Sequence, residues 1–293
     1  MDRQQWMILR ELIRCAVRAI GPSWRVDFKD ELIVSMYFWA VAHDRPLCWA
    51  CDRQHYHAVF RPRRLPSVSQ FCRRVKTDRF GRYLRHLHDT LTDHRALSGI
   101  NFFDGKPLAV GGFSRDPEAK AGYGVGRMDK GYKLHALVTA DRRIAAWSVL
   151  PLNVNEMTVA RVLIDQAVRV PAGAVFMADG NYDAHKLHKD IARRGGWLWV
   201  KPRGVGCHPV TRRQMGPARR ALLAVWQQTP RHAQRIYNTR VHVEGTFSNL
   251  TSYGGGLGPL PPFVRRLERV RRWVGAKIVL YHIRLKQRQT QAA

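Results

Sequence analysis

Acidic residues are scarce in this 293-residue sequence, and one long stretch contains none. Asp and Glu total 22 against 50 Lys and Arg, which gives a formal charge of +28. No acid occurs between Asp190 and Glu244, although that stretch carries eleven Lys and Arg residues. Solvated surfaces normally mix both signs of charge, so this imbalance predicts a polyanionic partner. We therefore expect the chain to bind nucleic acid.

Cysteines and long apolar runs are also few. Five cysteines at scattered positions are typical of reduced thiols rather than of a disulfide framework. No run of 18 apolar residues occurs, so no membrane span is expected. The start, MDRQQWMILR, lacks the basic-then-apolar layout of a signal peptide. These absences predict a soluble intracellular protein with no membrane partner.

Hydrophobic spacing divides the chain into two regions. Residues 1–97 read as mostly helical, and residues 65–91 give two short helical patterns with exposed arginines, as in a helix-turn-helix. Residues 98–293 alternate strand and helix patterns in the order βββ-α-β-α-β-α and end in a basic helix. We expect a helical DNA-binding region followed by an α/β domain. Four of its strands are expected at residues 100–104, 106–114, 174–179 and 197–202. Two more are expected within residues 133–152, joined at 141–143.

Three acidic residues stand at positions suited to a metal site. Asp104 and Asp179 each end an apolar run, and α/β sheets place their chemistry at strand ends. Glu244 lies in a helical pattern with Tyr237 and Arg240, where 100° per residue puts all three along the border of one apolar face. Glu244 is therefore the candidate third ligand.

The blocks around these residues carry a family resemblance. DGKPL at 104, DGNYD at 179 and Y-x2-R-x3-E at 237–244 resemble the three acidic blocks of bacterial insertion-sequence transposases of the DDE class, in the insertion-sequence-four branch. The linking segments SRDPEAKAG and KGYKLH resemble that branch as well, and the resemblance covers about residues 98–285. It implies a ribonuclease-H-like mixed sheet flanked by helices. In such a fold Asp104, Asp179 and Glu244 would bind two divalent ions, with Asp104 as the bridging ligand.

The resemblance also implies a reaction and its partners. A transposase binds the terminal inverted repeats of double-stranded DNA, nicks them and transfers the 3′-hydroxyl end into target DNA, in this case as a dimer in the bacterial cytoplasm. Two ions can activate the attacking oxygen and stabilise the leaving oxygen. Carboxylate ligands suit Mg²⁺ or Mn²⁺, whereas a Cys or His set would favour zinc.

Basic residues near these blocks are the candidate DNA contacts. Arg240 would bind phosphate, and Tyr237 would stack or hydrogen-bond near the scissile end. The other candidates lie in the basic cluster at 61–85 and in the acid-free stretch. They are Arg73, Arg74, Lys201, Arg203, Arg212 and Arg213.

One departure from the branch leaves alternatives open. Thr251 stands seven residues after the Glu, where the branch carries a lysine that would hold a terminal phosphate. Strand-end handling, including a hairpin intermediate, is therefore undecided. Thr251 favours a catalytically decayed DNA-binding protein derived from a transposase, and the intact Asp, Asp and Glu set opposes it. A structure-specific nuclease would keep the ions and lose strand transfer.

Several other polar residues have two interpretations. Asp179 could merely cap the following turn. Cys48 and Cys51, with His55 and His57, have zinc-like ligand types, but their compressed spacing also fits a simple helix-to-loop join. Surface or capping roles are expected for the remaining nearby acids, which are Asp116, Asp129 and Asp183.

Overall fold

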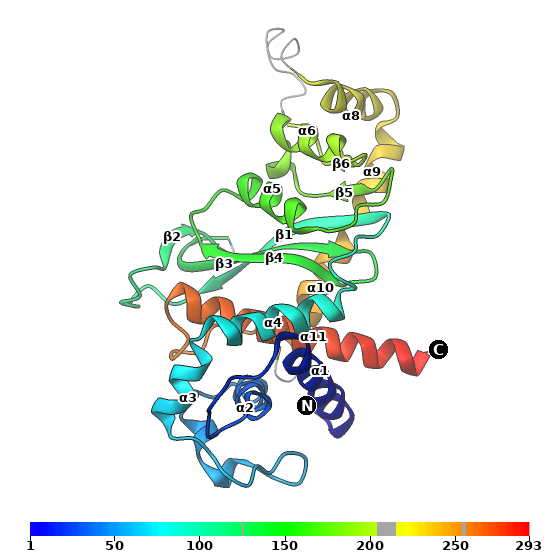
Figure 1. The fold of residues 1–293 in the computed structure, drawn as a ribbon. Coiled ribbons are helices and arrows are strands. Elements are labelled where there is room, and N and C mark those ends of the chain that lie inside the picture. Colours follow the sequence, from blue (N-terminus) through cyan, green and yellow to red (C-terminus); the bar gives the residue numbers. More distant parts are fainter. Residues whose placement is uncertain (125, 204–214, 254–255, 293) are drawn as a thin grey trace. The chain divides into compact units, whose positions relative to one another are not determined.

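The structure is a computed structural model that describes residues 1–124, 126–203, 215–253 and 256–292 (Figure 1). Its contacts divide the chain into two units, one formed by residues 1–94 with 249–293 and the other by residues 95–248. The sequence assigned the C-terminal helix to the α/β domain, whereas its contacts group it with the N-terminal helices. Hydrophobic spacing shows that the C-terminal helix has an apolar face, but it does not show which helices that face packs against.

The second unit is built on a mixed sheet. The strand order is β2-β3-β1-β5-β6, with β4 also paired to β3. β1 pairs antiparallel with β3 and parallel with β5, which in turn is parallel to β6. This confirms the predicted mixed α/β fold. The strands are β1 Ile100–Ala109, β2 Lys120–Tyr123, β3 Met128–Thr139, β4 Ile144–Pro151, β5 Val175–Met177 and β6 Trp197–Trp199.

Helices cover this sheet and complete its core. Apolar residues of α5 and α6 pack with Phe103 and Phe176 of the sheet in one buried cluster (Figure 1). On the other side of β1, Phe102 stacks on His242 of α10, with ring centroids 6.2 Å apart. Asn155 caps α5 by accepting a hydrogen bond from the Met157 N–H. The helices are α5 Glu156–Gln166, η3 Gly180–Tyr182, α6 His185–Arg193, α8 Pro217–Gln228, α9 Pro230–Asn238 and α10 Val241–Ser252.

The first strand is longer than the sequence predicted. The prediction that it ends at Asp104, with a neighbouring strand at 106–114, is wrong, because β1 runs through Asp104 to Ala109. Residues 101–109 of β1 all pair with β3. The Asp-Gly-Lys-Pro segment resembles a turn in composition. The strand nevertheless tolerates Pro107, because the pairing of β1 with β5 ends at Phe102 and no hydrogen-bond donor is needed on that side.

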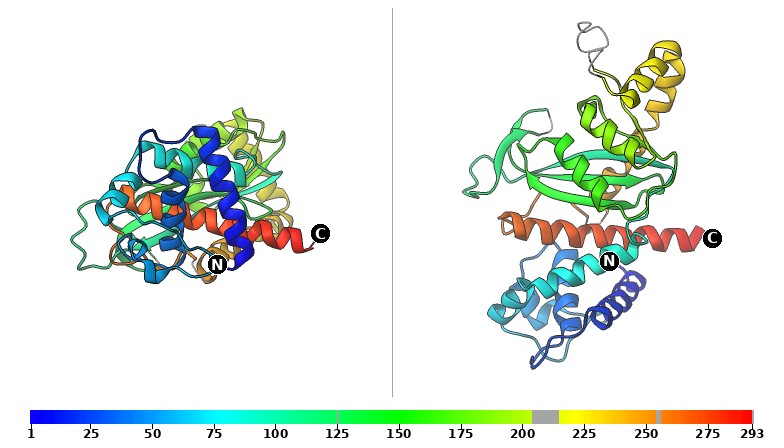
Figure 2. Two further views of the ribbon diagram at one scale, coloured as in Figure 1. Left: turned by 60° about the horizontal axis from the view of Figure 1, so that its bottom comes forward. Right: turned by 45° about the horizontal axis from the view of Figure 1, so that its top comes forward.

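The first unit is a helical assembly around α2. Every residue of α2 from Ile33 to Val41 is buried, and α1, α4 and α11 all contact it or one another. Figure 2 shows α11 beside α4. Ser67 caps α3 and Thr77 caps α4, which is where the sequence placed the two short helices. The elements are α1 Arg3–Ile20, α2 Asp30–Ala42, η1 Trp49–Cys51, η2 Arg53–His55, α3 Val68–Val75, α4 Asp78–Leu91 and α11 Leu267–Ala292.

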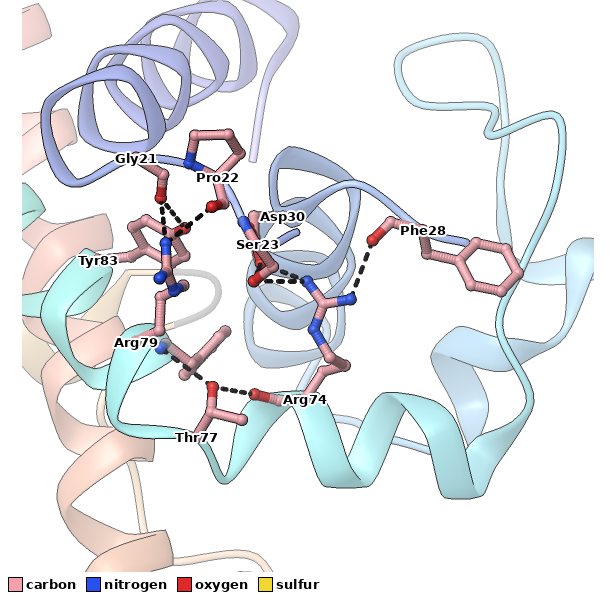
Figure 3. Close-up of polar contacts among 10 residues, drawn as sticks. Gly21, Pro22, Ser23, Phe28, Asp30, Arg74, Thr77, Arg79 and Tyr83 are labelled. Carbon is pink, nitrogen blue, oxygen red and sulfur yellow. Dashed lines mark hydrogen bonds and ion pairs between the residues drawn. The ribbon is translucent and has the colours of Figure 1, made fainter. Parts of the chain in front are cut away.

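Some arginines of the basic cluster hold this unit together (Figure 3). Arg74 pairs with Asp30 and donates to the Phe28 carbonyl at 3.0 Å. Although burial opposes ionisation of Asp30, hydrogen bonds from Ser23 and Arg74 hold the pKa of its carboxyl below the usual range. Arg79 donates to the carbonyls that follow α1, at 2.7 and 2.8 Å. The cluster therefore contains structural arginines as well as exposed ones.

Among the helices of the described ranges, none combines the length and the apolar character that crossing a membrane requires.

The two neighbouring arginines of α3 should differ in how much each contributes to stability. In the Arg74–Asp30 pair the side chains are only 19% and 6% exposed, so Arg74→Ala leaves a buried carboxylate unpaired and should lower the free energy of unfolding by about 3 kcal/mol. Arg73 is exposed, and Arg73→Ala should change the free energy of unfolding by less than about 0.5 kcal/mol. Urea denaturation of both variants measures this, and equal stabilities would contradict the structural role of Arg74.

Candidate active site

Asp104 and Asp179 stand at corresponding places relative to the parallel register of β1 and β5. That register ends with Phe102 paired to Met177, and each aspartate lies two residues further along the chain, Asp104 within β1 and Asp179 just after β5. Adjacent strands are about 4.8 Å apart, so we expect the two residues to lie near one another. The charge of Asp179 also raises the pKa of Asp104. That the two carboxylates form one site stays a prediction.

The Asp104 carboxylate lies in an environment that disfavours its charge. Its pKa is raised to about 6, and burial is the largest cause. The charges of Asp179 and Glu156 also raise the pKa. The Gly105 N–H, which donates to Oδ1 at 2.8 Å, and the charge of Arg240 lower it. In the described part of the chain, the carboxylate accepts no other hydrogen bond. Such a carboxylate has oxygens available for a cation.

Asp179 caps the turn that follows β5. Its Oδ1 accepts from the Asn181 N–H at 2.7 Å and its Oδ2 from the Asn181 side-chain amide at 3.1 Å. The capping interpretation of Asp179 is therefore correct as local structure. It does not compete with ligand binding, because each carboxylate oxygen retains a further lone pair.

The third block does not form the single helix that the sequence predicted. α9 ends at Asn238 and α10 begins at Val241, and the backbone between them turns through hydrogen bonds three residues apart. The Thr239 hydroxyl lies 3.1 Å from Met177 Sδ and 2.8 Å from the Ile236 carbonyl, which fixes this turn against the end of β5. Tyr237 and Glu244 therefore lie on different helices, and the helical spacing that put them along one face does not apply across the turn.

Tyr237, Arg240 and Glu244 nevertheless form one cluster. Arg240 Nη2 donates to Glu244 Oε1 at 2.8 Å, and its guanidinium carbon lies 5.9 Å from the centre of the Tyr237 ring. Glu244 is 55% exposed and turned to Arg240. Within the described ranges, no three His, Cys, Asp or Glu side chains converge closely enough to hold an ion. In this structure Glu244 is thus paired with Arg240, whose charge also acts on Asp104.

Two of the acids assigned to surface or capping roles are buried instead. The Asp183 side chain is fully buried, accepting from His188 Nε2 at 3.1 Å and from Arg219 at 2.8 and 2.7 Å. Burial opposes its ionisation, but these bonds and one from the Arg203 N–H hold the pKa of Asp183 well below its usual range. Asp116 accepts from the buried Tyr132 hydroxyl at 2.7 Å. Their burial arises from partners distant in sequence, which local patterns do not report.

The candidate DNA contacts fall into three groups. Arg73 and Lys201 are exposed, as the prediction requires. Arg203 is exposed too, and its guanidinium donates to the Asn181 side chain next to Asp179. The guanidinium of Arg74 is occupied by Asp30, so a DNA contact from it stays a prediction that this ion pair disfavours. Arg212 and Arg213 lie outside the described residues.

The candidate zinc residues have other partners. Cys51 Sγ contacts the Leu47 carbonyl at 3.7 Å, and His55 Nδ1 contacts the Trp49 carbonyl at 2.8 Å. Burial raises the pKa of the Cys51 thiol to about 11, which disfavours the thiolate that zinc needs. The structure is thus consistent with the helix-to-loop interpretation of this segment.

Sequence reasoning missed one charged pair beside Asp104. Lys133 of β3 and Glu156 at the start of α5 form an ion pair of 2.6 Å, and the charge of Glu156 raises the pKa of Asp104. The local signal was a carboxylate directly after the Asn155 cap, at a junction between strand and helix. That position is also common for acids that only stabilise a helix N-terminus, so the sequence did not single it out.

The raised pKa of Asp104 predicts a gain in stability when its charge is removed. Above about pH 6 the aspartate is ionised in both folded and unfolded chains, and the folded state bears the full penalty; below about pH 4 it is protonated in both. Asp104→Asn should therefore raise the free energy of unfolding at pH 7 by up to about 3 kcal/mol, with the gain vanishing near pH 4. Urea denaturation in EDTA across this range measures it, and a destabilised variant at pH 7 would contradict the electrostatic account.

Comparison with known proteins gives one family. A search among curated proteins found no match. Among solved structures, the cryo-EM structure of piggyBac transposase in a synaptic complex with hairpin DNA is similar at a TM-score of 0.44 and 10% identity, covering 95% of this chain and 72% of that one. The family model of the transposase DDE domain matches residues 96–257, which is more than half of the chain. The chain belongs to the transposase DDE domain family.

Proposed function

We propose that the protein is a DNA transposase that binds transposon ends, cleaves phosphodiester bonds with two divalent ions and transfers the strand into target DNA. The observation that carries the proposal is the parallel register of β1 and β5, beyond which Asp104 and Asp179 each stand two residues after the last pair, Phe102 and Met177. The family supports it, since its members are transposases.

The residues present fit divalent ions that prefer oxygen ligands. Asp104 and Asp179 would hold the ions, and the Asp104 carboxylate, which accepts only one hydrogen bond in the described ranges, would be shared between them. When bound, Mg²⁺ or Mn²⁺ ions activate the attacking oxygen and stabilise the leaving oxygen. The chain's own part is to hold these carboxylates at one strand edge and to surround them with cations.

Glu244 would join the site by exchanging its partner. In the free protein its carboxylate is paired with Arg240, whose charge also acts on Asp104. A DNA phosphate is a competing anion for Arg240, and a guanidinium binds it through two parallel hydrogen bonds. Phosphate binding by Arg240 would therefore release Glu244 toward the two aspartates, so that substrate binding completes the ligand set.

The basic surface would supply the DNA contacts. Exposed arginines of α3 and α4, together with Lys201 and Arg203 near the Asp179 turn, lie on both units of the chain. Binding through such residues releases condensed counterions and weakens steeply with salt. Terminal inverted repeats and target DNA are the proposed partners, with a dimer as the species bound to DNA in the cytoplasm.

Cleavage of DNA that carries the element's terminal repeats tests the proposal. The full chain should nick such DNA only with Mg²⁺ or Mn²⁺, and Asp104→Asn or Asp179→Asn should reduce the rate at least about 1,000-fold, because each removes an ion ligand. Asp165→Asn is the matched control, because Asp165 lies in an exposed ion pair with Arg194 and should leave the rate unchanged.

Three outcomes would alter the conclusion. Full activity in Asp179→Asn would overturn the site. Binding without cleavage by the wild-type chain would favour a decayed DNA-binding protein. Nicking without joining of a pre-nicked end to target DNA would favour a nuclease on the same fold.

A further inference from the structure

Trp24, in the loop between α1 and α2, is almost fully in contact with solvent. It is 88% exposed, whereas Trp6 and Trp39 of the same unit are 1% and 2% exposed. Val26, two residues further on, is 38% exposed. Single apolar side chains are common on protein surfaces, so the exposure of Trp24 gains meaning only from the way its loop is built.

Side chains of α4 fix the start of this loop. The Tyr83 hydroxyl and Arg79 Nη1 donate to the Gly21 carbonyl at 2.9 and 2.7 Å (Figure 3). Arg79 Nη1 also donates to the Pro22 carbonyl at 2.8 Å. Because proline in addition restricts its own φ angle, the backbone that leads into Trp24 is held before any partner arrives.

The end of the loop is tied to its start. The Ser23 N–H donates to Asp30 Oδ2 at 2.6 Å, and the Ser23 hydroxyl donates to Oδ1 at 3.1 Å. Arg74 pairs with the same carboxylate and donates to the Phe28 carbonyl at 3.0 Å (Figure 3). The residues on both sides of Trp24 are therefore joined in one hydrogen-bonded frame.

The tip of the loop lacks such contacts and is strained. Within the described ranges, no hydrogen bond involves residues 24–27. Arg25 has a φ of 50°, in the left-handed region that residues with a Cβ atom usually avoid. Such a conformation persists only where the surroundings impose it, and it is enriched at binding sites. The frame thus holds out a tip whose side chains have no partner within the chain.

The charges around this tip are mostly positive. Arg25 and Lys29 of the loop are exposed. The guanidinium carbon of Arg64, which is exposed too, lies 5.6 Å from the centre of the Phe28 ring. Asp27 is the exposed acid of the loop. This surplus of cations beside an exposed aromatic ring is complementary to a nucleic acid, which offers phosphates and flat bases together.

A nucleobase fits the indole better than a protein surface does. Stacking of a base on an aromatic side chain strengthens binding by about fivefold or more. A second copy of this chain would bring the same formal charge of +28 to the contact, which opposes association there. Bases inside a duplex are already stacked on both faces, so the indole requires a base that has left the stack.

We propose that Trp24 stacks on an unpaired base of the bound DNA, while Arg25 and Lys29 bind the phosphates next to that base. The loop is held in its binding conformation in advance, so little order is lost when DNA binds. This inference rests on the proposed function, because it requires that the partner be DNA.

Binding of the full chain to two fluorescein-labelled DNA probes in EDTA tests the inference. One probe is a duplex interrupted by a short single-stranded stretch of thymidines, and the other carries abasic sugars in that stretch with the same phosphates. Fluorescence anisotropy should show that the wild-type chain binds the thymidine probe about tenfold more tightly. Trp24→Ala should bring this ratio close to one, and Trp24→Phe, which keeps an aromatic ring, should retain part of it.

Two further variants serve as controls. Met7 is a 54% exposed apolar residue of α1, about 20 Å along that helix from the loop, and Met7→Ala should leave the ratio unchanged. Trp24→Ala removes no charge, so the slope of the logarithm of the binding constant against the logarithm of salt concentration should stay as in wild type. Arg25→Ala should reduce that slope by about one and leave the ratio between the probes nearly unchanged.

The outcomes separate this inference from the function on which it rests. A wild-type ratio in Trp24→Ala, or equal weakening for both probes, would overturn the stacking. Equal binding of both probes by the wild-type chain would also overturn it and leave DNA binding standing. Self-association of the wild-type chain that Trp24→Ala abolishes, measured by analytical ultracentrifugation, would overturn it in favour of a second copy. A wild-type chain that binds neither probe would overturn the DNA partner together with this inference.

Discussion

The parallel pairing of β1 with β5 is the constraint on which the rest of the site depends. It sets where Asp104 and Asp179 stand, because each follows the last pair of the register, Phe102 and Met177, by two residues. Burial and mutual repulsion make that arrangement unfavourable for the free protein, as the raised pKa of Asp104 shows. Within the described residues neither aspartate has a direct cationic partner, so the proposed binding of a cation would recover the stability lost there.

Two sets of contacts hold the end of β5 in place. The Asp183 carboxylate ties the turn after Asp179 to Arg219 of α8 and to the backbone of Arg203. The Thr239 hydroxyl ties the turn between α9 and α10 to Met177, the last residue of β5. Because Arg240 follows Thr239 directly, the same turn sets the position of Arg240, whose charge lowers the pKa of Asp104. The acidic site and its arginine are thus positioned from one strand end.

Local sequence patterns predicted the parts of this arrangement that depend on local physics. Apolar runs located β1, which contains Asp104, and β5, which ends two residues before Asp179. The patterns could not show that β1 continues past the Asp-Gly pair, because β3 provides the partner that keeps it extended. They could not show the break at Thr239 or the burial of Asp183, whose causes lie in contacts across the fold. For the same reason Glu156 looked like an ordinary first-turn acid.

The central claim is that Asp104 and Asp179 share a divalent ion. Crystals of the full chain grown with Mn²⁺ and measured at the manganese absorption edge test it most directly. The account predicts an anomalous peak within roughly 2.5 Å of a carboxylate oxygen of each aspartate. A peak bound elsewhere, with both aspartates free of metal, would contradict it.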